Sequence, residues 1–114
     1  MRTRIKMCGT TNIDDAFAAI DAGVDALGFI FFAKSPRNIL PEMAKEIISQ
    51  LPPFVDSVGV FVDEDIEKVK QLVSLCGLNH LQLHGNESVE YCEQLQKEKP
   101  ELRIMKAFRV GPEN

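Results

Sequence analysis

Strand-length apolar runs alternate with helix-length amphipathic segments along this chain, and no other feature constrains its fold as strongly. The expected strands are 3–8, 26–32, 57–62, 80–84 and 103–108. The intervening segments with apolar residues at helical spacing are 12–22, 41–51, 63–76 and 88–97. Successive strands begin on average about 25 residues apart, a spacing typical of βα units. The sequence therefore predicts a parallel α/β fold.

Residues that start and end helices flank these segments. Asn12 and Asp63 are placed to cap the first and third helices, and Pro41 suits the first turn of the second. Gly23 and Gly77 stand where a glycine often ends a helix in a left-handed backbone conformation. We found no linker or low-complexity segment that would divide the chain into domains.

Two parallel architectures fit this order: an open doubly wound sheet and a closed (β/α)8 barrel. Period-two alternation places four polar side chains on one common side of their strands: Lys6, Cys8, Gln82 and His84. A doubly wound sheet covers both faces with helices, whereas a barrel interior accepts polar groups near its catalytic end. The first βα loop also lacks a dinucleotide-binding glycine pattern. We therefore predict a (β/α)8 TIM-barrel fold.

Composition argues against several classes of protein. The 114 residues carry a net charge of −4 without a basic stripe, which argues against a nucleic-acid partner. No apolar run approaches the roughly 20 residues that span a bilayer, and no secretory signal precedes the first strand. Three cysteines without a C-x-x-C pair, and two histidines, disfavour disulfides and structural zinc. We expect a cytoplasmic protein.

The active site of a parallel α/β protein lies at the carboxyl ends of its strands. This rule selects five positions: Cys8, Arg37, Asp63, His84 and Arg109. Cys8 shares its face with Lys6, whose ammonium favours the thiolate form that acts as a base. Arg37 offers a planar fork of donors that matches a carboxylate.

Plain structural interpretations stand beside these assignments. Arg37 also fits an exposed loop arginine, and His84 also fits a hydrogen-bonding residue in the barrel mouth. Asp63 is expected to cap a helix rather than to take part in chemistry. Cys76 and Cys92 fall in the apolar stripes of helices, where cysteine packs as a small hydrophobic residue.

Short motifs from Ile5 to Phe108 resemble phosphoribosylanthranilate isomerase, in the family's order and at its spacing. The matching segments are 6–11, 14–16, 26–31, 35–37, 51–55, 58–62, 82–85 and 106–108. The resemblance implies the tryptophan-pathway Amadori rearrangement of N-(5-phosphoribosyl)anthranilate, an aminoaldose, to an aminoketose 5-phosphate. This reaction uses neither a metal nor an organic cofactor.

The resemblance also implies roles for individual residues. Cys8 matches the cysteine of the family's K-x-C-G motif, which is its general base. Arg37 matches the arginine of its S-P-R motif, expected at the anthranilate end of the substrate. Gln82 and His84 match its Q-L-H-G segment, expected to line the substrate pocket.

The family's general acid follows its sixth strand, and its phosphate-binding loops follow its seventh and eighth strands. We therefore expect residues 1–114 to be the N-terminal portion of one barrel domain, of about four βα units and a fifth strand. This portion alone should be inactive, and its two edge strands should make it aggregation-prone, partly molten or dimeric. Whether the protein is a monomer or a homodimer stays open.

Two other interpretations remain at this stage. The chain could belong to another (β/α)8 enzyme that acts on a phosphorylated sugar, because this fold hosts many reactions. It could also be a half-barrel scaffold without catalytic activity.

Overall fold

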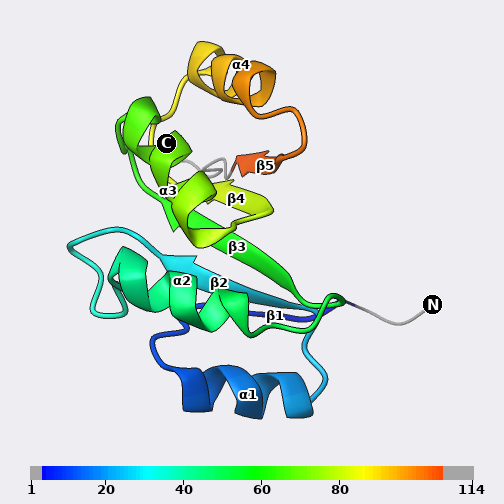
Figure 1. The fold of residues 1–114 in the computed structure, drawn as a ribbon. Coiled ribbons are helices and arrows are strands. Elements are labelled where there is room, and N and C mark those ends of the chain that lie inside the picture. The colour runs from blue at the N-terminus through cyan, green and yellow to red at the C-terminus, as the bar shows by residue number, and fades with distance from the viewer. Residues whose placement is uncertain (1–3, 107–114) are drawn as a thin grey trace, which may run out of the picture.

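Five parallel strands form a single sheet in the computed structural model, which describes residues 4–106 (Figure 1). The elements are β1 (Lys6–Met7), α1 (Ile13–Asp21), β2 (Ala26–Ile30), α2 (Pro41–Ser49), β3 (Asp56–Phe61), α3 (Ile66–Cys76), β4 (His80–Leu83), α4 (Val89–Glu98) and β5 (Arg103–Lys106). The strands lie side by side in chain order, and every neighbouring pair is parallel. Each helix thus connects two adjacent strands, as in successive βαβ units.

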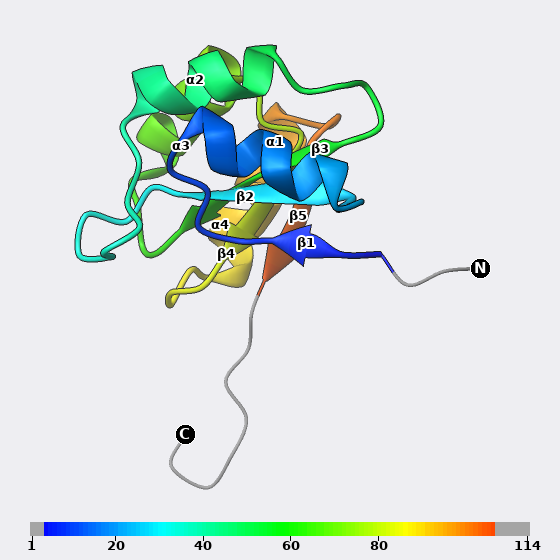
Figure 2. The same ribbon diagram turned by 90° about the horizontal axis from the view of Figure 1, so that it is seen from below.

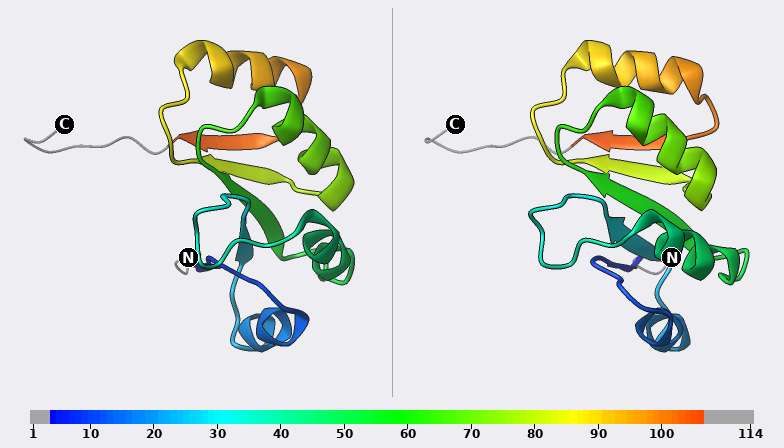
Figure 3. Two further views of the ribbon diagram at one scale, coloured as in Figure 1. Left: turned by 90° about the vertical axis from the view of Figure 1, so that its left-hand side faces the viewer. Right: turned by 60° about the vertical axis from the view of Figure 1, so that its left-hand side comes forward.

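The four helices of the described part lie on one face of this sheet. Figure 3 shows them in an arc around the outside of the strands, and Figure 2 shows α1 and α2 on the same side of β1 and β2. A doubly wound sheet would instead reverse its strand order and carry helices on both faces. The predicted barrel architecture is therefore confirmed, and the described residues form a section of a barrel wall.

The hydrophobic core lies between the outer face of the sheet and the helices. Its largest fully buried side chains are Leu27, Phe29, Ile47, Phe61, Val69, Leu81, Leu83 and Leu95. The rings of Phe31 and Phe61 stack with their centroids 5.2 Å apart. Cys76 is only 3% exposed and belongs to this core, and the half-buried Cys92 packs against it, as predicted.

Helix ends follow the sequence signals closely, with one exception. The Asn12 side chain accepts a hydrogen bond from the Asp15 N–H at 2.8 Å, and Pro41 opens α2. Gly23 and Gly77 both have left-handed backbones, with φ of 96° and 81°. These four predictions are confirmed.

The prediction that Asp63 caps the third helix is wrong. Helix α3 begins at Ile66, and its N-cap residue is Asp65. Asp63 lies two residues earlier with a positive φ of 52°, and its carboxylate accepts a hydrogen bond from the Asn86 N–H. The side chain is thus committed to the loop after β4 instead of to the first turn of α3.

Several strand ends differ from the expected bounds. Strand β2 ends at Ile30 instead of continuing to residue 32, and Ile30 also pairs with Asn38 in an isolated bridge. The expected strands 3–8 and 103–108 extend partly outside the described residues, and Arg109 lies wholly outside them. Among residues 4–106, no helix has the length and apolar composition needed to cross a membrane.

Gly59 tests the packing of the helices on the outer face. A Cβ at this position would lie 2.6 Å from Leu78 Cδ1 and 2.9 Å from Phe61 Cε2, and both neighbours are buried. We expect Gly59→Ala to lower the free energy of unfolding in urea by about 1–3 kcal/mol because the core must rearrange. Gln71→Ala, at an exposed position of α3, should change it by less than about 0.5 kcal/mol. Equal stability of Gly59→Ala and the parent chain would contradict this packing.

Candidate active site

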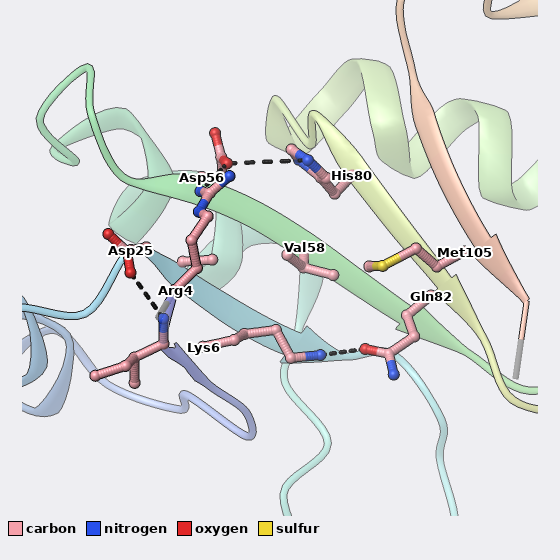
Figure 4. Close-up of a pocket in the computed structure, with 10 residues that line it drawn as sticks. Arg4, Lys6, Asp25, Asp56, Val58, His80, Gln82 and Met105 are labelled. Atoms are coloured by element: carbon pink, nitrogen blue, oxygen red, sulfur yellow. Dashed lines mark hydrogen bonds and ion pairs between the residues drawn. The ribbon is translucent and has the colours of Figure 1, made fainter. Parts of the chain in front are cut away.

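Polar side chains gather on the inner face of the sheet, which none of the helices in the described part covers. They surround a pocket of about 340 Å³ (Figure 4). The pocket is lined by Arg4, Ile5, Lys6, Asp25, Ala26, Asp56, Val58, His80, Gln82 and Met105. These residues come from all five strands and their amino-terminal flanks, so the pocket occupies the concave interior of the barrel wall.

A hydrogen bond between Lys6 and Gln82 spans this interior. Lys6 Nζ on β1 donates to Gln82 Oε1 on β4, although β2 and β3 separate the two strands (Figure 4). In a flat sheet, strands three places apart would lie about 14 Å from each other with parallel side chains. The bond fits a sheet that curls toward this face, as the arc of helices around its outer face also indicates (Figure 3). It also confirms that Lys6 and Gln82 share one side, as their strand positions predicted.

A second polar group lies nearer the amino ends of the strands. Arg4 Nη2 donates to Asp56 Oδ2 at 2.8 Å, and His80 Nε2 lies 3.9 Å from the same oxygen. This hydrogen bond and the charge of Asp56 raise the pKa of the Arg4 guanidinium above its usual value. The Ile5 N–H donates to the Asp25 carboxylate at 2.7 Å, which fixes the entry of β1 into the sheet.

The loop after β1 places Cys8 against the second strand. The N–H groups of Gly9 and Thr10 both donate to the Gly28 carbonyl, at 3.1 and 3.0 Å, so the loop folds back over β2. A Cβ on Gly28 would lie 3.2 Å from both Cα and Sγ of Cys8. The glycine thus leaves the space that Cys8 occupies, and the thiol-bearing residue remains exposed.

Arg37 reaches the same loop from the other side. Its side chain lies across Gly9: a Cβ there would come within 2.5 Å of Arg37 Cδ and 3.2 Å of Nη1. Gly9 also has a φ of 82°, which only glycine adopts readily. The loop after β2 returns to the sheet where Ile39 N–H donates to the Ile30 carbonyl at 3.0 Å. The structure therefore brings Arg37 beside the residue that follows Cys8.

The other two predicted site residues lie on β4 and directly after it. Gln82 is half-buried on the inner face, with its carbonyl oxygen engaged by Lys6. His84 follows the last residue of β4, and its N–H donates to the Phe61 carbonyl at 3.0 Å, while the residue as a whole is exposed.

A buried ion pair at the same end of the sheet was missed by sequence reasoning. Glu87 Oε1 lies 3.0 Å from Lys106 Nζ, and the Glu87 side chain is only 1% exposed. Glu87 lies only three residues after His84, at the end of a predicted strand. Its position in the sequence did not distinguish it from an exposed glutamate in a loop. Among residues 4–106, no group of three or more His, Cys, Asp and Glu side chains is arranged to hold a metal ion.

The strand order and the residues at the carboxyl ends of the strands define the class of protein. The chain forms part of a parallel (β/α) barrel, with an exposed cysteine and an arginine together at the carboxyl ends of its first strands. In such barrels this end carries the catalytic residues. A thiol can exchange protons there, and a guanidinium can bind an anionic group.

Comparison with known proteins identifies the family. Residues 5–113 match the family described as N-(5'phosphoribosyl)anthranilate (PRA) isomerase. The chain is 52% identical over 113 residues to the N-(5'-phosphoribosyl)anthranilate isomerase of Geobacter sp. (strain M21), covering 98% of this chain and 53% of that protein. The chain belongs to the N-(5'-phosphoribosyl)anthranilate isomerase family, and it spans about half the length of the curated relatives it matches.

Solved structures agree with this assignment. Phosphoribosyl anthranilate isomerase from Thermotoga maritima superimposes with a TM-score of 0.91 at 44% identity, over 98% of this chain and 53% of that one. A second isomerase structure has the same TM-score and identity over 98% of this chain and 56% of its own. That protein was solved in complex with reduced 1-(o-carboxyphenylamino)-1-deoxyribulose 5-phosphate.

The three cysteines should differ in their reaction with iodoacetamide. Cys8 is exposed, whereas burial raises the pKa of the Cys76 and Cys92 thiols and leaves less reactive thiolate at a given pH. We expect native protein to be alkylated first at Cys8 and last at Cys76, as read by peptide mass spectrometry. In urea the differences should disappear. Alkylation of Cys76 before Cys8 in native protein would contradict the described site.

Proposed function

We propose that this chain supplies the N-terminal half of an N-(5'-phosphoribosyl)anthranilate isomerase barrel. The observation that carries the proposal is the placement of the Arg37 side chain against Gly9, the residue that follows Cys8, in a chain of this family. The whole enzyme would convert the aminoaldose 5-phosphate to the corresponding 1-deoxyribulose 5-phosphate. We place this reaction of tryptophan biosynthesis in the cytoplasm, without a metal or an organic cofactor.

The proposed reaction is an acid–base isomerisation. An acid protonates the furanose ring oxygen, and the ring opens to a protonated Schiff base between the anthranilate nitrogen and C1′. The Cys8 thiolate then removes the proton from C2′. The electron pair of that C–H bond forms the C1′=C2′ double bond, and the π pair of the C1′=N bond moves to the nitrogen to give an enolamine. Tautomerisation of the enolamine yields the C2′ ketone. Cys8 is suited to the base role because it is exposed at the carboxyl end of β1.

Arg37 is proposed to bind the substrate's anthranilate carboxylate. Its side chain lies across Gly9, so a carboxylate held there would bind at the same loop that carries Cys8. The ligand in the related complex carries a carboxyphenyl group, the kind of group that Arg37 is proposed to bind. Gln82 and His84 are proposed to contact the substrate, with Lys6 fixing the Gln82 amide.

The acid and the phosphate-binding residues are proposed to come from the other half of the barrel. In the family these groups follow strands six to eight, and this chain spans only about half the length of its relatives. We therefore propose that residues 1–114 form the N-terminal portion of a single (β/α)8 domain. The substrate would bind across the boundary between the two halves.

Complementation tests the proposal. The 114-residue chain should show no isomerase turnover alone, and it should gain turnover when refolded with the C-terminal half of the Geobacter relative. Cys8→Ala should reduce kcat of the restored enzyme by about 10²–10⁴-fold, the usual contribution of a general base. Cys92→Ala, on helix α4, serves as the matched control and should retain most of the activity.

Arg37 gives an independent readout in the same assay. Arg37→Ala should raise KM for the phosphoribosylanthranilate by about 10–100-fold through loss of a charge-assisted contact, and lysine should restore it only partly. Full turnover by the isolated chain, or an unaffected Cys8→Ala variant in the restored enzyme, would contradict the proposal. The second result would point to another enzyme acting on a phosphorylated sugar.

A further inference from the structure

The Glu87 carboxylate is the most deeply buried charge in the described part of the chain. It lies in the loop between β4 and α4, and 1% of its side chain is exposed. Oε1 accepts a hydrogen bond from Lys106 Nζ at 3.0 Å, and Oε2 accepts one from the Asp63 N–H at 2.9 Å. Both carboxylate oxygens are therefore used, and their donors come from β5 and from the loop after β3.

Other bonds tie the same three segments together. Lys106 Nζ also donates to the Gly85 carbonyl, and the Asp63 carboxylate accepts the Asn86 N–H. Together with the bond from the His84 N–H to Phe61, these contacts hold four consecutive residues of the loop after β4. The first of these residues, His84, is exposed at the carboxyl end of the sheet.

The loop is also fixed by shape. A Cβ on Gly85 would lie 2.4 Å from Asp63 Oδ1 and 2.8 Å from Asp63 N, so the two loops are in direct contact. Asp63 adopts a φ of 52°, a conformation that is unfavourable for a residue with a side chain. Such a conformation persists where surrounding contacts impose it, and the bond to Glu87 is one of them.

We propose that Glu87 is a positioning residue, which through Lys106 and Asp63 holds His84 in place at the carboxyl end of the sheet. The proposal rests on the proposed function in one respect, namely that His84 contacts the substrate. Glu87 itself is buried on the helix side of the wall with Lys106, whose register partner Leu83 is a core residue. It therefore acts through the loop and touches no reacting atom.

The charge state of Glu87 is consistent with this role. Burial alone would raise its pKa, but the Asp63 N–H and the Lys106 ammonium outweigh burial and hold the pKa below its usual value. Glu87 is thus ionised at neutral pH and paired with a cation that is only 15% exposed. Removing one member of a buried pair leaves the other uncompensated.

Two substitutions on the 114-residue chain test the proposal without any activity assay. Glu87→Gln removes the charge opposite Lys106, and Glu90→Gln is the matched control at an exposed position three residues later. Amide hydrogen exchange and the ring resonances of His84 would be recorded by NMR. In Glu87→Gln, we expect exchange at Asp63 and Asn86 to rise by about tenfold or more and the His84 ring resonances to shift. Amides of β2 and β3 and all signals of the control should stay unchanged.

Glu87→Asp covers the case in which the glutamine variant does not fold. It retains the charge but is one methylene shorter, so the same local changes are expected in an otherwise intact chain. The proposal is overturned if exchange rises equally throughout the sheet, because Glu87 would then only stabilise the fold. It is also overturned if Asn86 and His84 do not change. Neither readout involves turnover, so failure here is distinguishable from failure of the proposed function.

Discussion

The hydrogen bond from Lys6 to Gln82 depends on the curl of the sheet, and the rest of the site depends on the same curl. Three strand spacings separate these residues along the sheet, yet their side chains meet over its inner face. Within residues 4–106, the helices lie on one side of the curved sheet and the strands follow chain order. The curvature makes the inner face concave, so polar residues from non-adjacent strands line one pocket. Val58 points into this pocket and is nevertheless buried.

Two glycines shape the carboxyl end of this wall where the proposed chemistry takes place. Gly28 leaves room for Cys8, and Gly9 allows the Arg37 side chain to cross the loop. Gly28 thus accommodates the proposed base, and Gly9 accommodates the proposed anion-binding arginine. On the next strands, the buried Glu87–Lys106 pair fixes the loop that begins at His84. At the carboxyl end of the sheet, Gly9 and Gly28 thus shape the region around β1 and β2, and the buried Glu87–Lys106 pair fixes the loop after β4.

Much of this arrangement could be predicted from sequence because it depends on periodicity. Alternating strand and helix patterns predicted every element, and period-two alternation placed Lys6 and Gln82 on one face. Features that depend on contacts between distant loops could not be predicted in this way. Aspartate is a common helix-capping residue, but the Asp63 carboxylate accepts a hydrogen bond from the Asn86 N–H and does not cap α3. Glu87 likewise looks like an exposed loop residue until the fold places Lys106 against it.

The curvature itself can be measured most directly by nuclear Overhauser spectroscopy on the 114-residue chain. The account predicts cross-peaks between the side-chain protons of Lys6 and Gln82, alongside the cross-strand peaks that connect β1 to β2, β2 to β3 and β3 to β4. Sheet cross-peaks without any contact between Lys6 and Gln82 would mean that these side chains do not meet over the inner face. That result would contradict the described geometry of the pocket.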